Sequence, residues 1–147
     1  MEKRINREIR ELSKIYNYID KSYDESIPTK KIVLEFDIYK FVVNKFYPFK
    51  PPTLYINNID YQTMIFTNND LFITDRLKKQ KIRCLCCSTL LCTNNWSPAK
   101  KLIHIINEYK INKRIMKQIR DEKYVYYVTK DRLPQEIIDI IINYIYS

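Results

Sequence analysis

The apolar residues near the start of the chain recur at the spacing of an amphipathic helix. Residues on one face follow one another at intervals of four and three: Ile5, Ile9, Leu12, Tyr16 and Ile19. Four basic residues lie on the opposite face: Lys3, Arg7, Arg10 and Lys14. The pattern predicts a helix over residues 2–19 that turns its apolar face to a core and its basic face to solvent or to a partner.

The next part of the chain has the composition of β-strands. Two runs rich in β-branched and aromatic residues, 31–39 and 40–46, predict neighbouring strands, and 54–56 predicts a third, short strand. Between them, the prolines of residues 47–52 exclude a central strand and predict a rigid, extended loop. Further along, Asn68-Asn69-Asp70 predicts the cap of a short helix that reaches Leu77.

The last third of the chain predicts two helices with a strand-like stretch between them. Pro98 suits the first turn of a helix, with Ser97 as its cap, and this helix extends toward Arg120. Residues 124–128 are β-like in composition, and residues 134–146 predict a closing helix with an isoleucine-rich core face. The order helix, strands, helices predicts an α+β domain with an antiparallel sheet.

Length and composition restrict the class of protein. With 147 residues, the chain is expected to form one domain over residues 1–147. The net charge of +9 suits anionic partners, but no compact Lys/Arg block is present, and the absence of glycine excludes Gly-rich phosphate loops, so nucleic acid is not the expected partner. No apolar run spans a bilayer, so no membrane contact is expected. The charged start of the chain does not resemble a secretory signal, and a cytoplasmic, reducing environment is expected.

All four cysteines lie within nine positions of the chain. In a reducing compartment, such clusters serve as nucleophiles, redox groups or metal ligands more often than as disulfides. Cys84 and Cys87 have the Cys-x-x-Cys spacing of a zinc knuckle, and Cys92 can add a third thiolate. His104 or Cys86 would have to supply the fourth ligand. Because no second Cys-x-x-Cys pair is present, a protein without a cofactor is the leading expectation, and zinc is the alternative.

Three ordered motifs resemble the ubiquitin-conjugating enzyme family. The segment Tyr47-Pro48-Phe49-Lys50-Pro51-Pro52 matches a signature of the family. Cys84-Leu85, followed by Trp96-Ser97-Pro98-Ala99, is similar to the family's active-site Cys-Leu and its Trp-Ser-Pro-Ala. Residues 3–9 resemble its opening helix. The resemblance covers residues 1 to about 110 and implies a ubiquitin-conjugating-enzyme-like α+β fold, with 111–147 as a divergent helical region.

The resemblance implies a function and a nucleophile. The chain would carry ubiquitin or a ubiquitin-like modifier as a cysteine thioester and transfer it to a lysine. The attacking group is a thiolate, and Cys84 is the implied nucleophile because Cys84-Leu85 matches the family's dipeptide, with Cys86 and Cys87 as alternates. The implied partners are the modifier, an activating enzyme and a ubiquitin ligase. In the family, the ligase and the activating enzyme dock on the positions that correspond here to Lys3, Arg7, Arg10, Lys14, Phe49, Ser97, Pro98 and Ala99.

The chain also departs from the family pattern. The family carries His-Pro-Asn before its active-site cysteine, whereas the corresponding place here holds Gln62-Thr63-Met64. Asn68 or Asn69 is therefore the expected donor to the oxyanion. The segment before Tyr47 is shorter than in the family, so one strand is expected to be missing. Two alternatives stay open: a non-catalytic protein that binds components of the ubiquitin system, and a small zinc-stabilised binding domain.

Overall fold

The chain divides into two compact units. The computed structural model describes residues 1–24, 31–65, 70–82 and 84–146. The first unit consists of Met1–Phe66 and Leu85–Tyr109, and the second of Thr67–Cys84 and Lys110–Ser147. The sequence predicts one domain over residues 1–147, whereas the structure divides the chain into two units. Residues 67–84, which the family resemblance covers, belong to the second unit.

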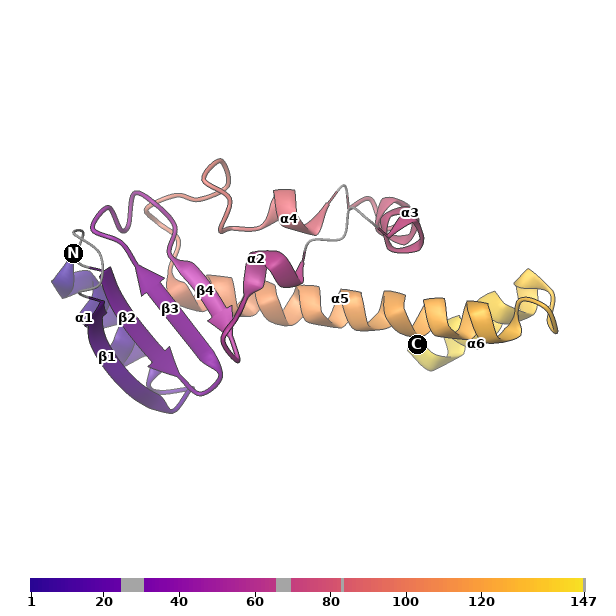
Figure 1. The fold of residues 1–147 in the computed structure, drawn as a ribbon, viewed down its shortest axis with the longest axis horizontal. Helices are drawn as coiled ribbons and strands as arrows, with labels where there is room; N and C mark the ends of the chain where they lie inside the picture. Colours follow the sequence, from indigo (N-terminus) through magenta and orange to yellow (C-terminus); the bar gives the residue numbers. More distant parts are fainter. Residues whose placement is uncertain (25–30, 66–69, 83, 147) are drawn as a thin grey trace. The chain divides into compact units, whose positions relative to one another are not determined.

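The first unit combines a helix with an antiparallel sheet. Each strand pairs with its neighbour in the sequence, so the sheet is a five-stranded meander (Figure 1). The elements are α1 (Glu2–Leu12), β1 (Tyr18–Asp24), β2 (Lys31–Phe36), β3 (Tyr39–Val43), β4 (Thr53–Ile56), β5 (Ile59–Asp60) and the short helices α2 (Tyr61–Met64) and α4 (Leu85–Ser88). Together with the first turns of α5 (Leu102–Thr129), they confirm the α+β class.

The strands predicted over 31–46 and 54–56 are confirmed as β2, β3 and β4. A tight turn joins β2 to β3, and Asp37 adopts a positive φ of 45° there. Asp tolerates this left-handed conformation better than most residues, because its short polar side chain can form local hydrogen bonds. The turn fixes the register, in which Leu34 pairs with Phe41.

The predicted first helix is too long. It ends at Leu12, and Tyr18–Asp24 forms β1, which pairs antiparallel with β2. The helical spacing of Tyr16 and Ile19 is therefore overridden by pairing with a neighbouring strand, a tertiary contact that local propensity does not contain. β1 thus lies in the segment before Tyr47, for which the sequence predicts one strand fewer than the family has.

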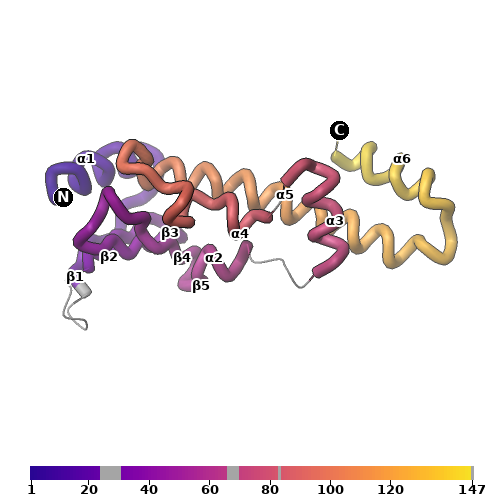
Figure 2. Tube along the Cα trace, turned by 90° about the horizontal axis from the view of Figure 1, so that it is seen from above, coloured from indigo at the N-terminus to yellow at the C-terminus, as the bar shows by residue number. Residues whose placement is uncertain are grey.

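One face of the sheet and the adjacent helices form the core of the first unit. Figures 1 and 2 show α1 and the start of α5 on the same side of the sheet. The strands alternate between buried and partly exposed side chains, as expected for a sheet with one covered face. The fully covered side chains include Ile5, Leu34, Phe36, Phe41, Leu54, Leu102, Ile105 and Ile106.

The second unit is helical. It contains α3 (Leu71–Lys79), the part of α5 after Tyr109, and α6 (Gln135–Tyr146). The cap predicted for α3 is confirmed, because the Asp70 side chain accepts a 3.2 Å hydrogen bond from the N–H of Ile73. The closing helix is also confirmed, although Ile137, Ile140 and Ile145 are exposed and only two of its side chains are buried: Ile138 and Ile142.

The strand-like stretch at 124–128 is helical and belongs to α5. Its aromatic residues stack on α3 instead of a strand: the ring of Tyr126 lies 5.7 Å from that of Phe72. These aromatic residues therefore make their ring contacts with a helix, although their composition suggested a β-strand. Although α5 has 28 residues, none of the described helices is long and apolar enough to cross a membrane.

Asp70 connects α3 to α5 by charge. Nζ of Lys123 lies 2.7 Å from its carboxylate, and this hydrogen bond lowers the pKa of Asp70 below its ordinary value. A lowered folded-state pKa stabilises the fold above the pKa of the unfolded chain, and the contribution is lost as the pH falls through the folded value. Asp70→Asn keeps a capping side chain and should lower the melting temperature at neutral pH by about 1–3 °C.

Thermal melting between neutral pH and a pH well below 3.8, the ordinary pKa of an aspartate, measures this contribution. The difference between wild type and Asp70→Asn should shrink as the pH falls. Asp75→Asn is the matched control, because Asp75 pairs with Lys79 at 3.3 Å on an exposed surface. A difference that stays constant with pH would show that the Asp70–Lys123 pair is not responsible.

Candidate functional site

The three motifs of the family resemblance contact one another in the first unit. The indole Nε1 of Trp96 donates a 2.6 Å hydrogen bond to the carbonyl of Pro48. The guanidinium of Arg4 donates to the carbonyl of Pro98 at 2.5 Å. The proline-rich loop, the Trp-Ser-Pro-Ala turn and α1 are therefore hydrogen-bonded into one surface, which we call the motif surface (residues 3–14, 46–50 and 96–99).

The buried carboxylate of Glu8 links the segments that form the motif surface. Glu8 is 1% exposed, and its oxygens accept hydrogen bonds from the Tyr47 hydroxyl at 2.6 Å, from the backbone N–H of Leu102 at 2.8 Å and from Nε of Arg4 at 2.8 Å. Burial and the adjacent carboxylate raise the pKa of the Tyr47 phenol well above its usual value. One side chain of α1 thus fixes the loop and the start of α5.

This carboxylate also explains where α5 begins. The sequence predicts a helix with Pro98 in its first turn and Ser97 as its cap, and this prediction is wrong, because α5 starts at Leu102. The acceptor for the N–H of Leu102 is Glu8, which is far away in the sequence. The Ser97–Lys100 segment is therefore free to form a turn, closed by the bond from the N–H of Lys100 to the carbonyl of Ser97.

The outer side of the motif surface is exposed. Phe49 is 76% exposed and Phe46 is 50% exposed, so Phe49 does not pack into the core. Pro98 and Ala99 are exposed, and Ser97 is partly buried. All four basic residues predicted for the first helix are exposed as well: Lys3, Arg7 and Arg10 on α1, and Lys14 just after the helix ends. Every residue predicted for partner binding thus has at least part of its surface accessible.

Sequence reasoning did not identify Arg4 and Glu8, which bridge the motifs. A signal was present, because they stand four positions apart on α1 and form an ion pair with 2.8 Å between Nε and Oε1. The apolar stripe of α1 would have to include position 8, which lies one turn before Leu12. A charged residue on an apolar stripe indicates a buried partner.

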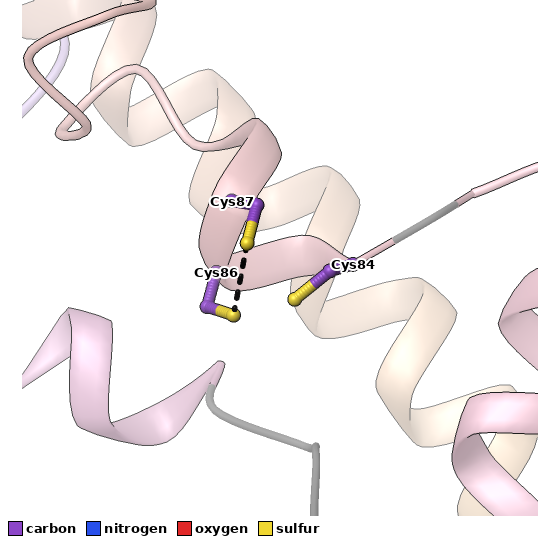
Figure 3. Close-up of side chains that lie close together, drawn as sticks. All are labelled: Cys84, Cys86 and Cys87. Carbon is purple, nitrogen blue, oxygen red and sulfur yellow. Dashed lines mark hydrogen bonds between the residues drawn. The ribbon is translucent and has the colours of Figure 1, made fainter.

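Three of the four cysteines lie close together. Figure 3 shows Cys86 and Cys87 on the single turn of α4 and Cys84 directly before it, and their Sγ atoms all lie within 4.8 Å of one another. The Sγ atoms of Cys86 and Cys87 are 3.9 Å apart. The residues are sequence neighbours at the point where the chain passes from the second unit into the first.

The cysteines differ in their accessibility and bonding state. Cys84 is 8% exposed, and Cys84 and Cys86 are disulfide-bonded. Cys87 is exposed and free, and Cys92 is partly buried and free. The sequence predicts reduced thiols, whereas the structure has Cys84 and Cys86 in a disulfide. An attacking thiol must be accessible, and Cys87 meets this requirement better than Cys84.

This arrangement of the cysteines gives little support to the alternative of a zinc site. It names Cys84, Cys87 and Cys92, whereas the structure groups Cys86, and not Cys92, with the other two. A structural zinc site needs four ligands, whereas the group in the described part of the chain has three sulfurs, two of which are in the disulfide. Nδ1 of His104, the other candidate ligand, accepts a 3.1 Å hydrogen bond from a backbone N–H of its own turn.

The segment that follows Cys87 is held by two polar side chains. Nδ2 of Asn95 donates to the carbonyls of Cys87 at 2.7 Å and of Thr89 at 3.0 Å. Glu108 of α5 accepts from the Thr89 hydroxyl and, at 2.7 Å, from the N–H of Leu90. These bonds fix the backbone next to the exposed thiol, which reduces the freedom of a group attached there.

The donor to an oxyanion is not identified among the described residues. The predicted candidates Asn68 and Asn69 lie outside the described residues. Asn95 lies close in the chain, but both N–H groups of its amide are bonded to backbone carbonyls. Gln62-Thr63-Met64, which replaces the family's His-Pro-Asn, lies in the short helix α2, where all three residues are exposed.

None of the protein-family models, curated proteins or solved structures with which the chain was compared matches it. The geometry of the first unit is therefore the basis for a functional proposal. That geometry joins three motifs at an exposed surface and places an exposed, free thiol on α4.

Proposed function

We propose that this chain is a divergent ubiquitin-conjugating protein that carries ubiquitin or a ubiquitin-like modifier as a thioester on Cys87. The observation that supports it best is the motif surface, in which Trp96 bonds to Pro48 and Arg4 bonds to Pro98. Trp96 and Pro48 are 48 positions apart in the chain, and Arg4 and Pro98 are 94 positions apart. Three short matches that arose by chance would have no reason to contact one another, whereas the parts of one functional surface would.

The chemistry follows from the exposed thiol of Cys87. Its thiolate attacks the carbonyl of the thioester between the modifier and the activating enzyme; a new C–S bond forms, and the thiolate of the activating enzyme leaves. A lysine amine then attacks the new thioester, forms an amide and releases the Cys87 thiolate, and the proton of the amine passes to solvent. Cys87 is free and exposed, as both steps require.

The motif surface provides the docking site for the activating enzyme and a ligase. Phe49 projects from a loop stiffened by Pro48, Pro51 and Pro52, so little conformational entropy is lost when it binds. Exposed aromatic side chains on rigid supports are typical anchors of interfaces. The basic residues of α1 would increase the association rate with an acidic partner and make it depend on salt.

Phe49→Ala should weaken binding to a ligase domain at least tenfold and leave the melting temperature unchanged. The side chain is 76% exposed, so its removal opens no cavity, but it takes away the anchor. Pull-down with a panel of ubiquitin-ligase domains measures binding, and thermal melting measures stability. Ile19→Ala is the control for binding, since Ile19 is an exposed apolar residue of β1, at 55%.

Phe41→Ala provides the opposite control for stability. Phe41 is fully buried in β3, and its truncation should destabilise the first unit by about 3–5 kcal/mol. If Phe49→Ala lowered the melting temperature as much as Phe41→Ala, Phe49 would belong to the core. Ligase binding that survives both Phe49→Ala and Pro98→Ala would contradict the docking role of the motif surface.

A second candidate is a non-catalytic protein that uses the same surface. It is favoured by the burial of Cys84, the cysteine that matches the family's active-site dipeptide, and by α2 in place of His-Pro-Asn. Such a protein would bind ligases or activating enzyme without accepting the modifier. The two candidates share the motif surface and differ in whether Cys87 forms a thioester.

A further inference from the structure

The second unit gathers three aromatic rings from two helices. The ring of Phe72 on α3 lies 5.7 Å from that of Tyr126 and 6.4 Å from that of Tyr127 on α5. The two tyrosine rings meet edge to face at 5.4 Å. All three line an open cavity of about 530 Å³ that the first turns of α6 also border. Tyr127 is 54% exposed, so a flat ligand can reach its ring.

Cations surround these rings. The guanidinium of Arg76 lies 5.2 Å from the centre of the Phe72 ring, and Nζ of Lys130 lies 5.3 Å from that of Tyr127. Arg76 also pairs with Glu122 at 3.3 Å, whereas the structure gives no ion pair for Lys130 among the described residues. Lys130 is therefore the cation beside the cavity whose charge is best available to an anion.

The charge of the chain is concentrated in the second unit. Its 56 residues include 13 Lys and Arg and 7 Asp and Glu, which gives a net charge of +6. The 91 residues of the first unit include 13 basic and 10 acidic residues, a net charge of +3. The smaller unit thus carries twice the net charge of the larger one, which favours an extended anion as its ligand.

Two carboxylates also line the cavity, and their negative charge restricts which ligands can bind there. Asp75 pairs with Lys79 at 3.3 Å, and Asp139 accepts a 2.9 Å hydrogen bond from the side chain of Gln135. A simple phosphate or an acidic peptide would be repelled here. The exocyclic amino group of a nucleobase, in contrast, donates to a carboxylate, while its ring stacks on an aromatic side chain.

We propose that the second unit binds single-stranded nucleic acid, with one base stacked against Phe72 and Tyr127 in this cavity and the phosphates beside Lys130. Aromatic faces next to cations are the usual construction of sites for single strands. A duplex would not fit this site, because its bases are already stacked on one another. The sequence contains no compact basic block, because the site joins residues 72–79 with residues 126–139.

Fluorescence anisotropy with the full chain and a labelled oligodeoxycytidine of about twelve nucleotides tests the proposal. Binding should be saturable and should weaken as salt rises. Tyr127→Ala should weaken it about tenfold, because one stacked base is lost. Tyr127→Phe, which keeps the ring, should bind as wild type does. Tyr124→Ala should have no effect, since Tyr124 is 71% exposed on the same helix but does not line the cavity.

A charge variant distinguishes binding at the cavity from general electrostatic attraction to a basic chain. Lys130→Glu should weaken binding and reduce its dependence on salt, whereas Lys14→Glu in the first unit should do much less. An unlabelled oligodeoxycytidine should compete better than polyglutamate or a DNA duplex of equal length. Circular dichroism checks that every variant is folded.

Several results would overturn the proposal. The first is the absence of binding at about 50 mM salt, where phosphate contacts are strong. The second is an equal loss of affinity in Tyr124→Ala and Tyr127→Ala, or none in either. The third is competition by polyglutamate or duplex as effective as by the single strand, which would indicate an acidic protein surface or a nonspecific polyanion as the ligand. None of these measurements requires an activating enzyme, so they are independent of thioester formation.

Discussion

Glu8→Ala is expected to destabilise the first unit by about 3–5 kcal/mol, because it removes one partner from a buried, charged network. Glu8 is 1% exposed and accepts hydrogen bonds from Arg4, Tyr47 and the N–H of Leu102. Without the carboxylate, the Tyr47 hydroxyl and the N–H of Leu102 are left in the interior without this acceptor, and Arg4 loses its counter-charge. The loop, α1 and the start of α5 would lose their common link.

Chemical denaturation measured by circular dichroism gives this free energy of unfolding. Glu11→Ala is the matched control: Glu11 also lies on α1 and pairs with Lys101 at 2.9 Å, but its side chain is 40% exposed, so its removal should leave stability almost unchanged. Glu8→Gln should lie between the two, because one oxygen remains as an acceptor. A loss in Glu8→Ala no larger than in Glu11→Ala would show that the Glu8 network contributes little.

Cys87→Ser is expected to abolish the reducible adduct with the modifier, the largest functional effect that we predict. Cys87 is exposed and free, whereas Cys84 is buried and disulfide-bonded. A serine hydroxyl is a much weaker nucleophile than a thiolate, so any product formed there would be an ester that thiols do not cleave. The Cys84→Ser variant should still form the adduct, although its sequence context matches the family's active-site dipeptide.

The matched control for Cys87→Ser is Cys92→Ser, since Cys92 is free but partly buried. This variant should form the adduct at the wild-type rate. The protein should be treated with a reductant, which is then removed, so that no sample retains a disulfide. Loss of the adduct in Cys84→Ser, with Cys87→Ser unaffected, would assign the thioester to Cys84 as the sequence first suggested.

Much of the sheet could be predicted because its signals are local. β-branched and aromatic runs mark β2 and β3, and the prolines of residues 47–52 mark the loop before β4. The cap of α3 is also local, since Asp70 binds the N–H of Ile73 three positions later. Each of these signals lies within a few residues of the element that it specifies.

The errors in the fold arose where a distant residue determines the structure. α5 begins at Leu102 because Glu8 accepts its N–H, and nothing near Ser97 reveals that acceptor. β1 forms by pairing with β2, although the spacing of Tyr16 and Ile19 favours a helix. Residues 124–128 are helical, and their aromatic rings contact Phe72 on α3.

The sequence predicts the candidate site only in part, because some of its contacts join residues that are distant in the chain. The motifs identify which segments form the surface, and the prolines around Phe49 indicate that it projects from a rigid loop. The sequence does not show which cysteine is accessible: Cys84 is buried, whereas Cys87, only three residues later, is exposed. It also does not reveal Arg4 as the link between α1 and the Pro98 turn, which depends on tertiary structure.

Thioester formation by the wild-type protein is the most direct test of the proposed function. The reduced protein is incubated with an activating enzyme, ATP and ubiquitin or a ubiquitin-like modifier, and the products are separated on a non-reducing gel. We predict a band at the combined mass of protein and modifier that disappears on treatment with a thiol reagent and is absent from Cys87→Ser. If no such band formed with any modifier, while Phe49-dependent ligase binding was retained, the chain would be a binding protein and not a carrier of the modifier.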